Sequence, residues 1–306
     1  MKVNTLHPLF AAELVGADAA RPDAQLVETV EDAMREHAVL CIRDQSHIDD
    51  EQHLAFARAF GPLELPGNKP HHGGRVAFGL YDVSNLGPDG EIIEPDSPRA
   101  KIAKGNELFH ADSSFNDLPS KWSMLRGVTV TPERGETETI DMRAVYDALP
   151  QETKVRLEGL EAQHNYFHSR RKAGAKVDES TNPLAPYMRS VQPVVRTSAS
   201  GRKALFVGAH TERILGLDEA ESKALIDELV AFATQPRFIY AHTWRQGDIL
   251  IWDNRCTLHR GTAYDYRNHK RDMRRATINE AGEDRSAIPA ELSLQMLAEP
   301  AKSSAR

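Results

Sequence analysis

The segment "RFIYAHTWRQGDILIWDN" (residues 237–254) constrains the fold of this chain more than any other. Between Phe238 and Trp244 every second side chain is a large ring, which is the repeat of a β-strand whose alternate residues face the same way. Residues 246–248 (Gln-Gly-Asp) supply turn chemistry, and "ILIW" continues as a second strand. This part of the chain is therefore predicted to form sheet.

Helical patterns and further strands surround this region. Apolar spacing and end signals predict helices at residues 22–37, 46–61, about 142–160 and about 217–235. Ser46 and the acidic residues after it can cap the second helix, "AVLCIRD" after the first helix is a buried strand, and "VAFGLYDVSNL" contains a short one. Short strands with turn signals, wrapped by a few helices, predict a mainly β fold: a β-sandwich or jelly roll with helical insertions.

Composition and charge narrow the range of partners. The chain has 306 residues, of which 40% are hydrophobic and 27% charged, and a formal net charge of -7. These values are typical of a globular protein and argue against binding of nucleic acid or an anionic membrane, so a small molecule is the expected partner and a homo-oligomer is left open. We expect a cytoplasmic protein in which Cys41 and Cys256 are buried thiols. One domain is expected over residues 1–282, followed by a loosely anchored tail over residues 283–306.

The stretch "NELFHADSSF" (residues 106–115) carries two side chains that can bind a metal, His110 and Asp112. On a β-strand these two would project from one face while Ala111 turns away. One imidazole and one carboxylate make two-thirds of the facial triad of non-haem Fe(II) oxygenases, which needs one further histidine. By itself the pair is better explained as hydrogen-bonded polar residues at a strand end.

A second cluster makes a metal site the better explanation of the pair. It lies in "WDNRCTLHRGTAYDYRNHKRDMRRATI" (residues 252–278). His259 follows the "ILIW" strand and lies far along the chain from Asp112, as expected if two distant strands close on one metal. "RDMRRATI" is predicted to be a strand on which Arg271 and Arg275 share a face. Two guanidiniums that face inward near a metal need anionic partners, because unpaired buried charge is costly, and dicarboxylates are natural candidates.

With these motifs the chain resembles the taurine and 2,4-dichlorophenoxyacetate dioxygenases, which depend on Fe(II) and 2-oxoglutarate. The similarity runs through "LHPLFAA", "DEQHLAFARAFGPL", "FHADSSF", "GETETIDMRAVYDALP", "GRKALFVGAH" and "GDILIWDNRCTLHRGTAYDY" to "RRATI". "LHPLFAA", "DMRAVYDALP" and "WDNRC" with "LHRG" resemble the 2,4-dichlorophenoxyacetate branch in particular. The resemblance implies a double-stranded β-helix, which is a jelly roll.

The resemblance also implies roles at the metal and at the co-substrate. His110, Asp112 and His259 match the iron ligands of the family. Thr137, in "GETET", matches the threonine that helps to hold the distal carboxylate of 2-oxoglutarate. Arg271 matches the arginine that pairs with the same carboxylate.

On the substrate side, the resemblance assigns two further residues. Arg275 matches the arginine that binds the acidic group of the substrate, and Asn106 matches a substrate-side asparagine. Phe109 stands where relatives often have tryptophan, and it is expected to form part of the pocket wall.

The spacing between His259 and the arginine pair departs from the pattern of the taurine enzymes, where it is one residue shorter. This difference leaves Lys270 and Arg274 as alternatives to Arg271. The strand-face argument favours Arg271, because it shares a face with Arg275.

Family chemistry implies that 2-oxoglutarate and O2 are converted to succinate and CO2 while the substrate is hydroxylated. For an aryloxyalkanoate such as 2,4-dichlorophenoxyacetate, hydroxylation next to the ether oxygen gives a hemiacetal that collapses to a phenol and glyoxylate. One alternative is a dioxygenase for taurine, another alkyl sulfonate or a sulfate ester, because a guanidinium suits a sulfonate nearly as well as a carboxylate. The other alternative is a non-catalytic jelly-roll protein that binds a metal or a small acid.

Histidines outside the triad carry weaker expectations. Four of them could face the substrate or be solvated: His71, His72, His164 and His168. His210 and His242 are expected to be strand residues satisfied by hydrogen bonds, and His269 is a rival ligand that lacks the family context. The basic stretch "SRRKAGAK" is expected to be a solvated loop, with a lid over the pocket as the alternative.

Overall fold

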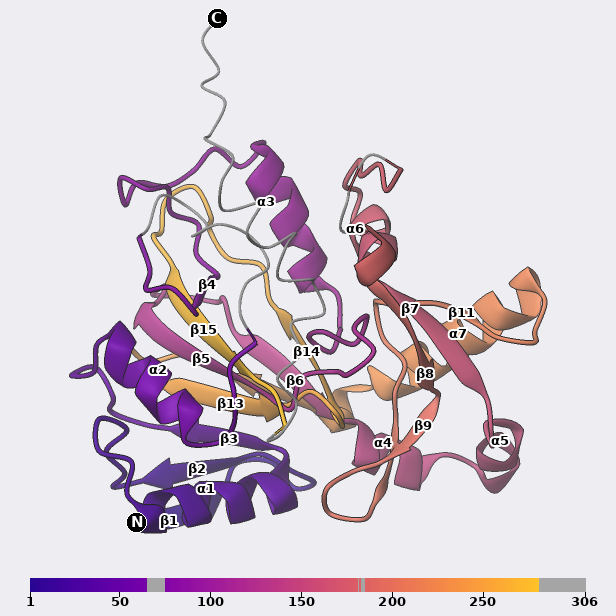
Figure 1. Ribbon diagram of the computed structural model, residues 1–306, viewed down its shortest axis with the longest axis horizontal. Coiled ribbons are helices and arrows are strands. Elements are labelled where there is room, and N and C mark those ends of the chain that lie inside the picture. The colour runs from indigo at the N-terminus through magenta and orange to yellow at the C-terminus, as the bar shows by residue number, and fades with distance from the viewer. Residues whose placement is uncertain (65–74, 181, 183–184, 281–306) are drawn as a thin grey trace, which may run out of the picture.

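The computed structural model of the protein describes residues 1–64, 75–180, 182 and 185–280 (Figure 1). Its largest sheet within these residues has seven strands, in the order β1-β2-β3-β13-β5-β15-β4. Their bounds are β1 Lys2–Thr5, β2 Ala12–Val15, β3 Val39–Ile42, β4 Tyr81–Asp82, β5 Trp122–Thr129, β13 Ile249–Asp253 and β15 Asp272–Ile278. Strands from both ends of the sequence therefore lie side by side in this sheet.

Three smaller sheets complete the strand content of the described part. One is β12-β6-β14, one is β11-β7-β8, and one is the pair β10-β9. The bounds are β6 Thr137–Asp141, β7 Glu161–Asn165, β8 Arg189–Pro193, β9 Val195–Thr197, β10 Lys203–Leu205, β11 Thr211–Ile214, β12 Ile239–His242 and β14 Thr257–Gly261.

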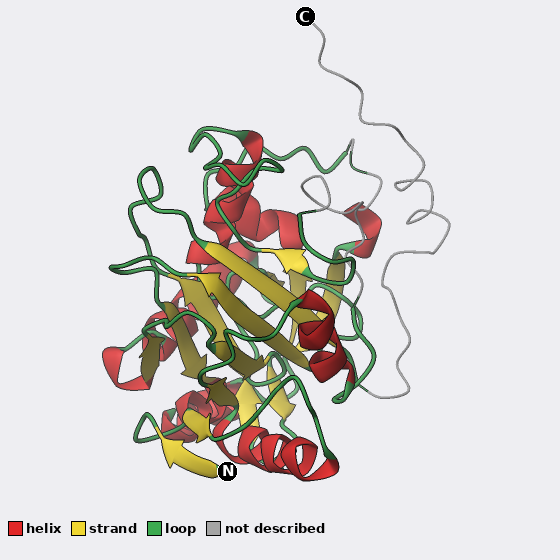
Figure 2. Cartoon of the chain, turned by 90° about the vertical axis from the view of Figure 1, so that its left-hand side faces the viewer, coloured by secondary structure: helices red, strands yellow, loops and turns green. Residues whose placement is uncertain are grey.

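Helices lie around these sheets (Figure 2). Their bounds are α1 Ala24–His37, α2 Asp50–Arg58, α3 Pro98–Ala103, α4 Met142–Ala148, α5 Gln151–Arg156, α6 Tyr166–Lys172 and α7 Glu219–Ala233, with 3-10 turns η1 Lys104–Glu107, η2 Ala185–Tyr187 and η3 Pro236–Phe238. The predicted first helix, the buried strand after it and the predicted last helix are confirmed as α1, β3 and α7. No helix in the described part of the chain is both long and apolar enough to cross a membrane.

Alternation along β13 gives the large sheet two different faces. Ile249 and Ile251 belong to a hydrophobic cluster with residues of α1 and α2, so these helices cover one face. Leu250 and Trp252 point the other way and pack in a second cluster that includes Trp244. The second face is therefore directed away from the helices and toward the segment that follows β12.

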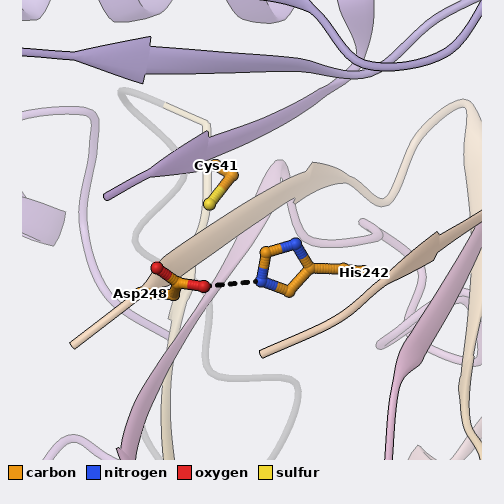
Figure 3. A group of neighbouring side chains, drawn as sticks. All are labelled: Cys41, His242 and Asp248. Carbon is orange, nitrogen blue, oxygen red and sulfur yellow. Dashed lines mark hydrogen bonds and ion pairs between the residues drawn. The ribbon is translucent and has the colours of Figure 1, made fainter. Parts of the chain in front are cut away.

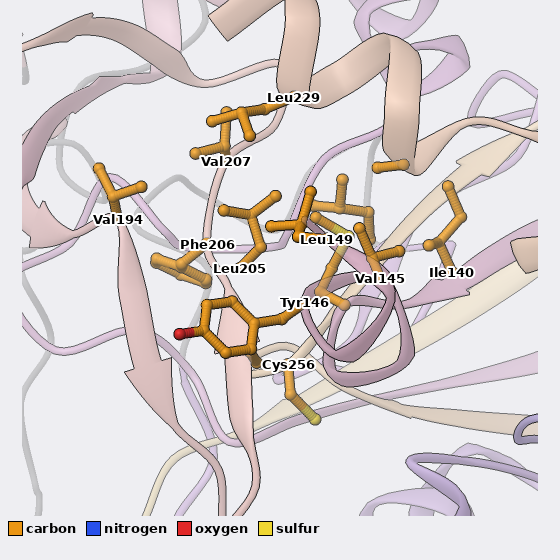
Figure 4. Packing of buried hydrophobic residues seen from close by; sticks show 14 of the residues in the cluster. Ile140, Val145, Tyr146, Leu149, Val194, Leu205, Phe206, Val207, Leu229 and Cys256 are labelled. Carbon is orange, nitrogen blue, oxygen red and sulfur yellow. The ribbon is translucent and has the colours of Figure 1, made fainter. Parts of the chain in front are cut away.

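A third and larger cluster packs α4 and α7 against the smaller sheets (Figure 4). Val145 of α4, Leu229 of α7, Leu205 of β10 and Ile140 of β6 are all fully or almost fully buried there. Burial of this apolar surface, the main favourable term in folding, ties the smaller sheets to one another.

The predicted turn at residues 246–248 is present, but the two strands that it joins belong to different sheets. In β12, His242 pairs with Thr137 of β6, whereas in β13 Ile249 pairs with both Ile42 and Arg126. Gly247 has a φ of +85°, and a Cβ at this position would lie 2.3 Å from the backbone nitrogen of Ser46. The crossing from one sheet to the other therefore requires glycine here.

Several predicted elements differ from the structure. The single helix predicted near 142–160 is wrong: Pro150, which has no N–H to continue a helix, separates α4 from α5. The second helix is shorter than predicted, Asp50–Arg58, and of the possible caps it uses the acidic Asp49, in a capping box with Gln52, in place of Ser46. The basic stretch is not simply a solvated loop, because Arg170 in it is a buried residue of α6.

Two further expectations concern the cysteines and the tail. Cys41 and Cys256 are free and buried, as predicted. The predicted tail, residues 283–306, lies outside the described residues.

Replacing Gly247 by alanine tests the sheet-to-sheet turn. Gly216 is a matched control, because its φ of +82° is similar but nothing lies within 4 Å of its missing Cβ. We expect Gly247→Ala to lower the free energy of unfolding, measured by urea denaturation, by about 1 kcal/mol or more beyond Gly216→Ala. Equal losses in the two variants would show that the contact with Ser46 is unimportant.

Candidate active site

Two backbone hydrogen bonds join His110 to His259. The amide of His110 donates to the carbonyl of His259 (3.0 Å), and the amide of His259 donates to the carbonyl of His110 (2.8 Å). The two imidazole rings lie with their centroids 4.2 Å apart. Segments far apart in the sequence thus place two histidines side by side, as the sequence predicted for distant ligands of one metal.

Asp112 completes a buried group of three. Its Oδ1 lies 3.8 Å from Nε2 of His110, and its Oδ2 lies 3.6 Å from Nε2 of His259. The two residues do not lie on a regular strand: His110 makes a single bridge, and the chain turns from Asp112 onward, with Ser113 at a φ of +54°. The carboxylate nevertheless lies beside both imidazoles, and the ligand atoms of the three residues lie within 4.8 Å of one another.

The protonation of this group suits a divalent cation. Nδ1–H of His110 donates to the carbonyl of Leu108 (2.7 Å), which leaves the lone pair of Nε2 for a metal. Burial lowers the pKa of His110 to about 4 and holds the pKa of His259 well below its usual range, so both rings are neutral at pH 7. Burial alone would raise the pKa of Asp112, but the charge of Arg275 and the neighbouring imidazoles hold it well below its usual range. Two neutral imidazoles and one carboxylate are the donor set of a facial triad.

Arg275, on β15, contacts the triad directly. Its guanidinium pairs with Oδ1 of Asp112 at 2.5 Å and lies 4.7 Å from the ring centroid of Tyr81. Nε of Arg275 is buried without a hydrogen-bond partner in the described part of the structure. One arginine thus pairs with the carboxylate of the triad, and its side chain stays 17% exposed.

Arg271 differs from Arg275 because none of the described carboxylates pairs with it. It is 8% exposed, and its guanidinium donates to the carbonyl of Gly135 (3.2 Å) and lies 5.7 Å from the ring centroid of Tyr264. Burial lowers its pKa, which is the mark of a cation that lacks a charged partner. A bound anion would neutralise such a group.

The two alternatives to Arg271 are already engaged elsewhere. Lys270 is exposed and pairs with Glu91 (2.9 Å). Arg274 pairs with Asp50 (2.6 Å) and Asp272 (3.0 Å) on the opposite face of β15. Neither side chain is placed to receive a carboxylate beside the triad.

Thr137 lies buried at the start of β6, between β12 and β14. Its Oγ1 accepts a hydrogen bond from the indole Nε1–H of Trp244 (3.1 Å). Because the indole can only donate, the proton of the threonine hydroxyl remains available to an acceptor such as a carboxylate.

A second group with metal-binding residue types consists of Cys41, His242 and Asp248, and it lies next to Thr137 because His242 pairs with that residue. Figure 3 shows that His242 points to Asp248, with Cys41 beside them. Oδ2 of Asp248 already interacts with Nε2 of His242 (3.1 Å) and with Arg43 (2.6 Å). Burial raises the pKa of the Cys41 thiol, so the thiol is protonated at neutral pH. This group is a structural hydrogen-bond network, and the prediction that His242 is satisfied in this way is confirmed.

Asn106 lies on η1, where Arg170 of α6 fixes its side chain. Nη1 of Arg170 donates both to Oδ1 of Asn106 (3.0 Å) and to the carbonyl of Ile102 (3.0 Å). The amide nitrogen is therefore the donor that Asn106 can offer to a ligand. The role of Arg170 was not predicted, because nothing in a run of basic residues shows which one is buried.

The surroundings of His210 differ from those predicted from the sequence. It was expected to be satisfied by hydrogen bonds, but its Nδ1 is buried with no partner among the described residues. Its ring packs edge-on against His110 (5.5 Å between centroids) and Phe115 (5.0 Å) and stacks on Tyr166 (6.1 Å). These rings form an aromatic wall beside the triad, and only the position of His210 at the end of "GRKALFVGAH" hinted at it.

The other expected residues lie as follows. Nδ1 of His164 bonds to Ser114 (3.1 Å), while its Nε2 has no partner in the described part. His168 lies on α6, and His269 belongs to neither metal-type group found among the described residues. His71 and His72 lie outside those residues.

Phe109 does not face the triad. It is buried in the largest hydrophobic cluster, with the guanidinium of Arg260 4.4 Å from its ring centroid. Phe109 and Ala111 both belong to this cluster, so they point away from the side occupied by His110. The expected contribution of Phe109 to the pocket wall is therefore wrong.

Comparison with known proteins identifies close relatives. The family model described as "Taurine catabolism dioxygenase TauD, TfdA family" matches residues 2–277. The alpha-ketoglutarate-dependent 2,4-dichlorophenoxyacetate dioxygenase of Burkholderia sp. (strain RASC) is 42% identical over 286 residues, which cover 90% of this chain and 94% of the relative. The (S)-phenoxypropionate/alpha-ketoglutarate-dioxygenase of Sphingobium herbicidovorans is 36% identical over 86% of this chain and 90% of the relative. The crystal structure of AAD-2 in complex with Mn(II) and N-oxalylglycine superimposes with a TM-score of 0.83 and 38% identity, over 91% of this chain and 97% of that one.

These relatives define the class: the protein is a dioxygenase that depends on 2-oxoglutarate (alpha-ketoglutarate), and hence an oxidoreductase. The chain belongs to the TauD, TfdA family. The predicted jelly roll with helical insertions is confirmed by its solved relatives, which share the fold.

Replacing Asp112 by asparagine tests the metal-binding group, since it keeps the shape of the side chain and removes its charge. We expect Mn(II) binding, measured by titration of the free ion, to weaken by more than about 100-fold, beyond the usual effect of losing an outer contact. His269→Asn is the control and should bind Mn(II) like the original protein. Unchanged affinity in a folded Asp112→Asn variant would remove Asp112 from the site.

Proposed function

We propose that the protein uses Fe(II), 2-oxoglutarate and O2 to hydroxylate an aryloxyalkanoate, such as 2,4-dichlorophenoxyacetate, at the carbon next to the ether oxygen. His110, Asp112 and His259 would hold the iron. The observation that carries the proposal is the contrast between Arg271, which is buried, and Arg275, which is partly exposed and contacts the triad. Arg271 has no carboxylate partner among the described residues, whereas Arg275 already contacts Asp112, so the two guanidiniums lie in different electrostatic surroundings.

The donor set supports Fe(II) as the metal. Two neutral imidazoles and one carboxylate leave three positions of an octahedral ion for other ligands. Iron, when bound there, supplies the oxidising chemistry by which O2 and 2-oxoglutarate become succinate and CO2. The protein contributes binding, orientation and exclusion of water.

Arg271 and Thr137 are proposed to hold the distal carboxylate of 2-oxoglutarate. The guanidinium provides charge, and the threonine hydroxyl provides a proton, because its oxygen already accepts from Trp244. Gly135 permits this arrangement: its φ is +75°, and a Cβ there would lie 2.8 Å from Thr131 and 3.5 Å from Nε of Arg271. In the Gly135-Glu136-Thr137 sequence, the carbonyl of Gly135 contacts Arg271, and the hydroxyl of Thr137 follows two residues later.

Arg275 and Asn106 are proposed to bind the acidic group of the substrate. The side chain of Arg275 is 17% exposed, so part of it stays accessible to a ligand, and Asn106 keeps its amide nitrogen. The aromatic wall formed by His210, Phe115 and Tyr166 beside His110 suits an aryl ring. This wall supports an aryloxy acid over a purely aliphatic substrate.

In the proposed reaction the two atoms of O2 enter different products. One oxygen atom of O2 enters succinate and the other becomes the new hydroxyl on the carbon between the ether oxygen and the carboxylate. The resulting hemiacetal loses its ether bond: the hydroxyl proton is transferred to the departing oxygen, which leaves as a phenol. The carbon skeleton that remains is glyoxylate when the substrate is an aryloxyacetate.

An alkyl sulfonate or a sulfate ester is the second candidate, because Arg275 could bind a sulfonate through the same donors. Relatives named for sulfate esters are less similar to this chain than those named for 2,4-dichlorophenoxyacetate, and this ranking favours the aryloxy acid. Non-catalytic binding of a small acid or a metal is disfavoured by the family membership.

A substrate panel tests the proposed reaction. Purified protein with Fe(II), 2-oxoglutarate and O2 should release succinate when 2,4-dichlorophenoxyacetate is added, together with an equal amount of phenol. Taurine, an alkyl sulfate and aryloxypropionates serve as competing substrates. Faster succinate release with taurine or the sulfate would replace the aryloxy assignment, and no release with any of them, while a known relative works in parallel, would refute it.

Arg271→Lys and Arg275→Lys test the division between the two anion sites. Lysine keeps the charge but loses the planar pair of donors. We expect Arg271→Lys to raise the apparent KM for 2-oxoglutarate about tenfold or more, and Arg275→Lys to do the same for the aryloxy acid, each with little effect on the other ligand. Equal effects of both variants on both ligands would mean that the two sites are wrongly divided.

A further inference from the structure

Asn254, directly after β13, makes hydrogen bonds with its whole side-chain amide. It is fully buried, and its Oδ1 accepts from the indole of Trp252 (3.0 Å) and from the backbone amide of Asp112 (3.2 Å). Its Nδ2 donates to the hydroxyls of Ser120 and Ser123, both at 3.0 Å. All four hydrogen-bonding positions of this amide are therefore used.

The orientation of the Asn254 amide follows from its partners. The indole of Trp252 and the backbone amide of Asp112 can only donate, so the oxygen must face them. Turning the amide over would direct its NH2 group at two N–H donors and bury all of them without acceptors, which is costly. Nδ2 must therefore face the two serines.

This orientation determines the direction of the next hydrogen bond. Because Ser123 accepts from Asn254, its single hydroxyl proton points to Oδ2 of Asp112, at 2.7 Å. An ionised carboxylate can only accept, so the donor sequence Asn254, Ser123, Asp112 has one consistent direction. Ser123 lies on β5, inside the large sheet, where its position is set by pairing with β13 and β15.

We propose that Ser123, oriented by Asn254, is the positioning residue that sets the plane of the Asp112 carboxylate toward the metal. This inference rests on the proposed metal-binding role of His110, Asp112 and His259. Asp112 needs such support because the chain turns immediately after it and Ser113 has a positive φ, so no strand holds it. Asn254 fixes its backbone, Ser123 fixes one carboxylate oxygen, and Arg275 contacts the other. Outer contacts of this kind control metal affinity in other proteins, typically by 10- to 100-fold.

The chain offers a matched control in Ser120. Ser120 and Ser123 are both fully buried, and both accept from Nδ2 of Asn254 at the same distance. They differ in what they reach next: Ser120 approaches only the backbone carbonyl of Asp112, at 3.5 Å, whereas Ser123 bonds to its carboxylate. Ser120→Ala and Ser123→Ala therefore disturb Asn254 alike and Asp112 differently.

The experiment measures the dissociation constants of Mn(II) and Co(II) for the purified protein without O2, the visible absorption of bound Co(II), and the melting temperature without metal. We expect the two alanine variants to melt at similar temperatures. Ser123→Ala should bind both metals about tenfold or more weakly and change the Co(II) bands, which report coordination geometry. Ser120→Ala should stay within about threefold of the original affinity, well below the tenfold effect of a lost outer contact.

The outcomes separate the inference from the proposed function. Equal metal affinities and Co(II) spectra in the two serine variants would overturn the role of Ser123. His110→Ala is included for the underlying site: if it binds both metals as the original protein does, the proposed metal centre itself fails. Weakening in Ser123→Ala alone, with His110→Ala unable to bind, supports both.

Discussion

The structure depends on the buried carboxylate of Asp112, whose negative charge must be stabilised by neighbouring side chains. Asp112 is 6% exposed, and a charge at that depth persists only when it is paired and hydrogen-bonded. Its partners come from separate segments, Arg275 from β15 and Ser123 from β5, and the neutral imidazole of His259 from β14 lies beside it. The large sheet and the β12-β6-β14 sheet thus meet around one negative charge, and the site exists only when both sheets are in place.

The two arginines near this charge show how one side-chain type serves different purposes. Arg275 stabilises Asp112 before any ligand arrives, so its charge is already partly used. Arg271 contacts a backbone carbonyl and an aromatic ring, which fix the position of its guanidinium but do not neutralise its positive charge. An unpaired buried cation lowers the stability of the folded protein. Functional sites retain such groups, because a bound anion removes this cost.

Sequence reasoning predicted what depends on local pattern and on motifs. The 3.6-residue repeat located α1 and α7, the two-residue repeat located the C-terminal strands, and the family motifs selected the residues that the fold brings together around Asp112. It could not predict which sheet each strand joins, since pairing between β3 and β13 is invisible in either segment. For the same reason, two features that depend on neighbours from distant segments could not be predicted: the burial of Arg170, and Nδ1 of His210, which has no partner among the described residues.

The crossing of the chain at Gly247 has a consequence for how the protein is made. β13 lies between β3 and β5 in the large sheet, so these two earlier strands have no partner on that side until the last part of the chain has been synthesised. A nascent chain therefore exposes apolar strand edges, the feature that promotes aggregation during slow, long-range folding. The segment that contains β13 and β14 therefore both covers these strand edges and adds His259 to the site.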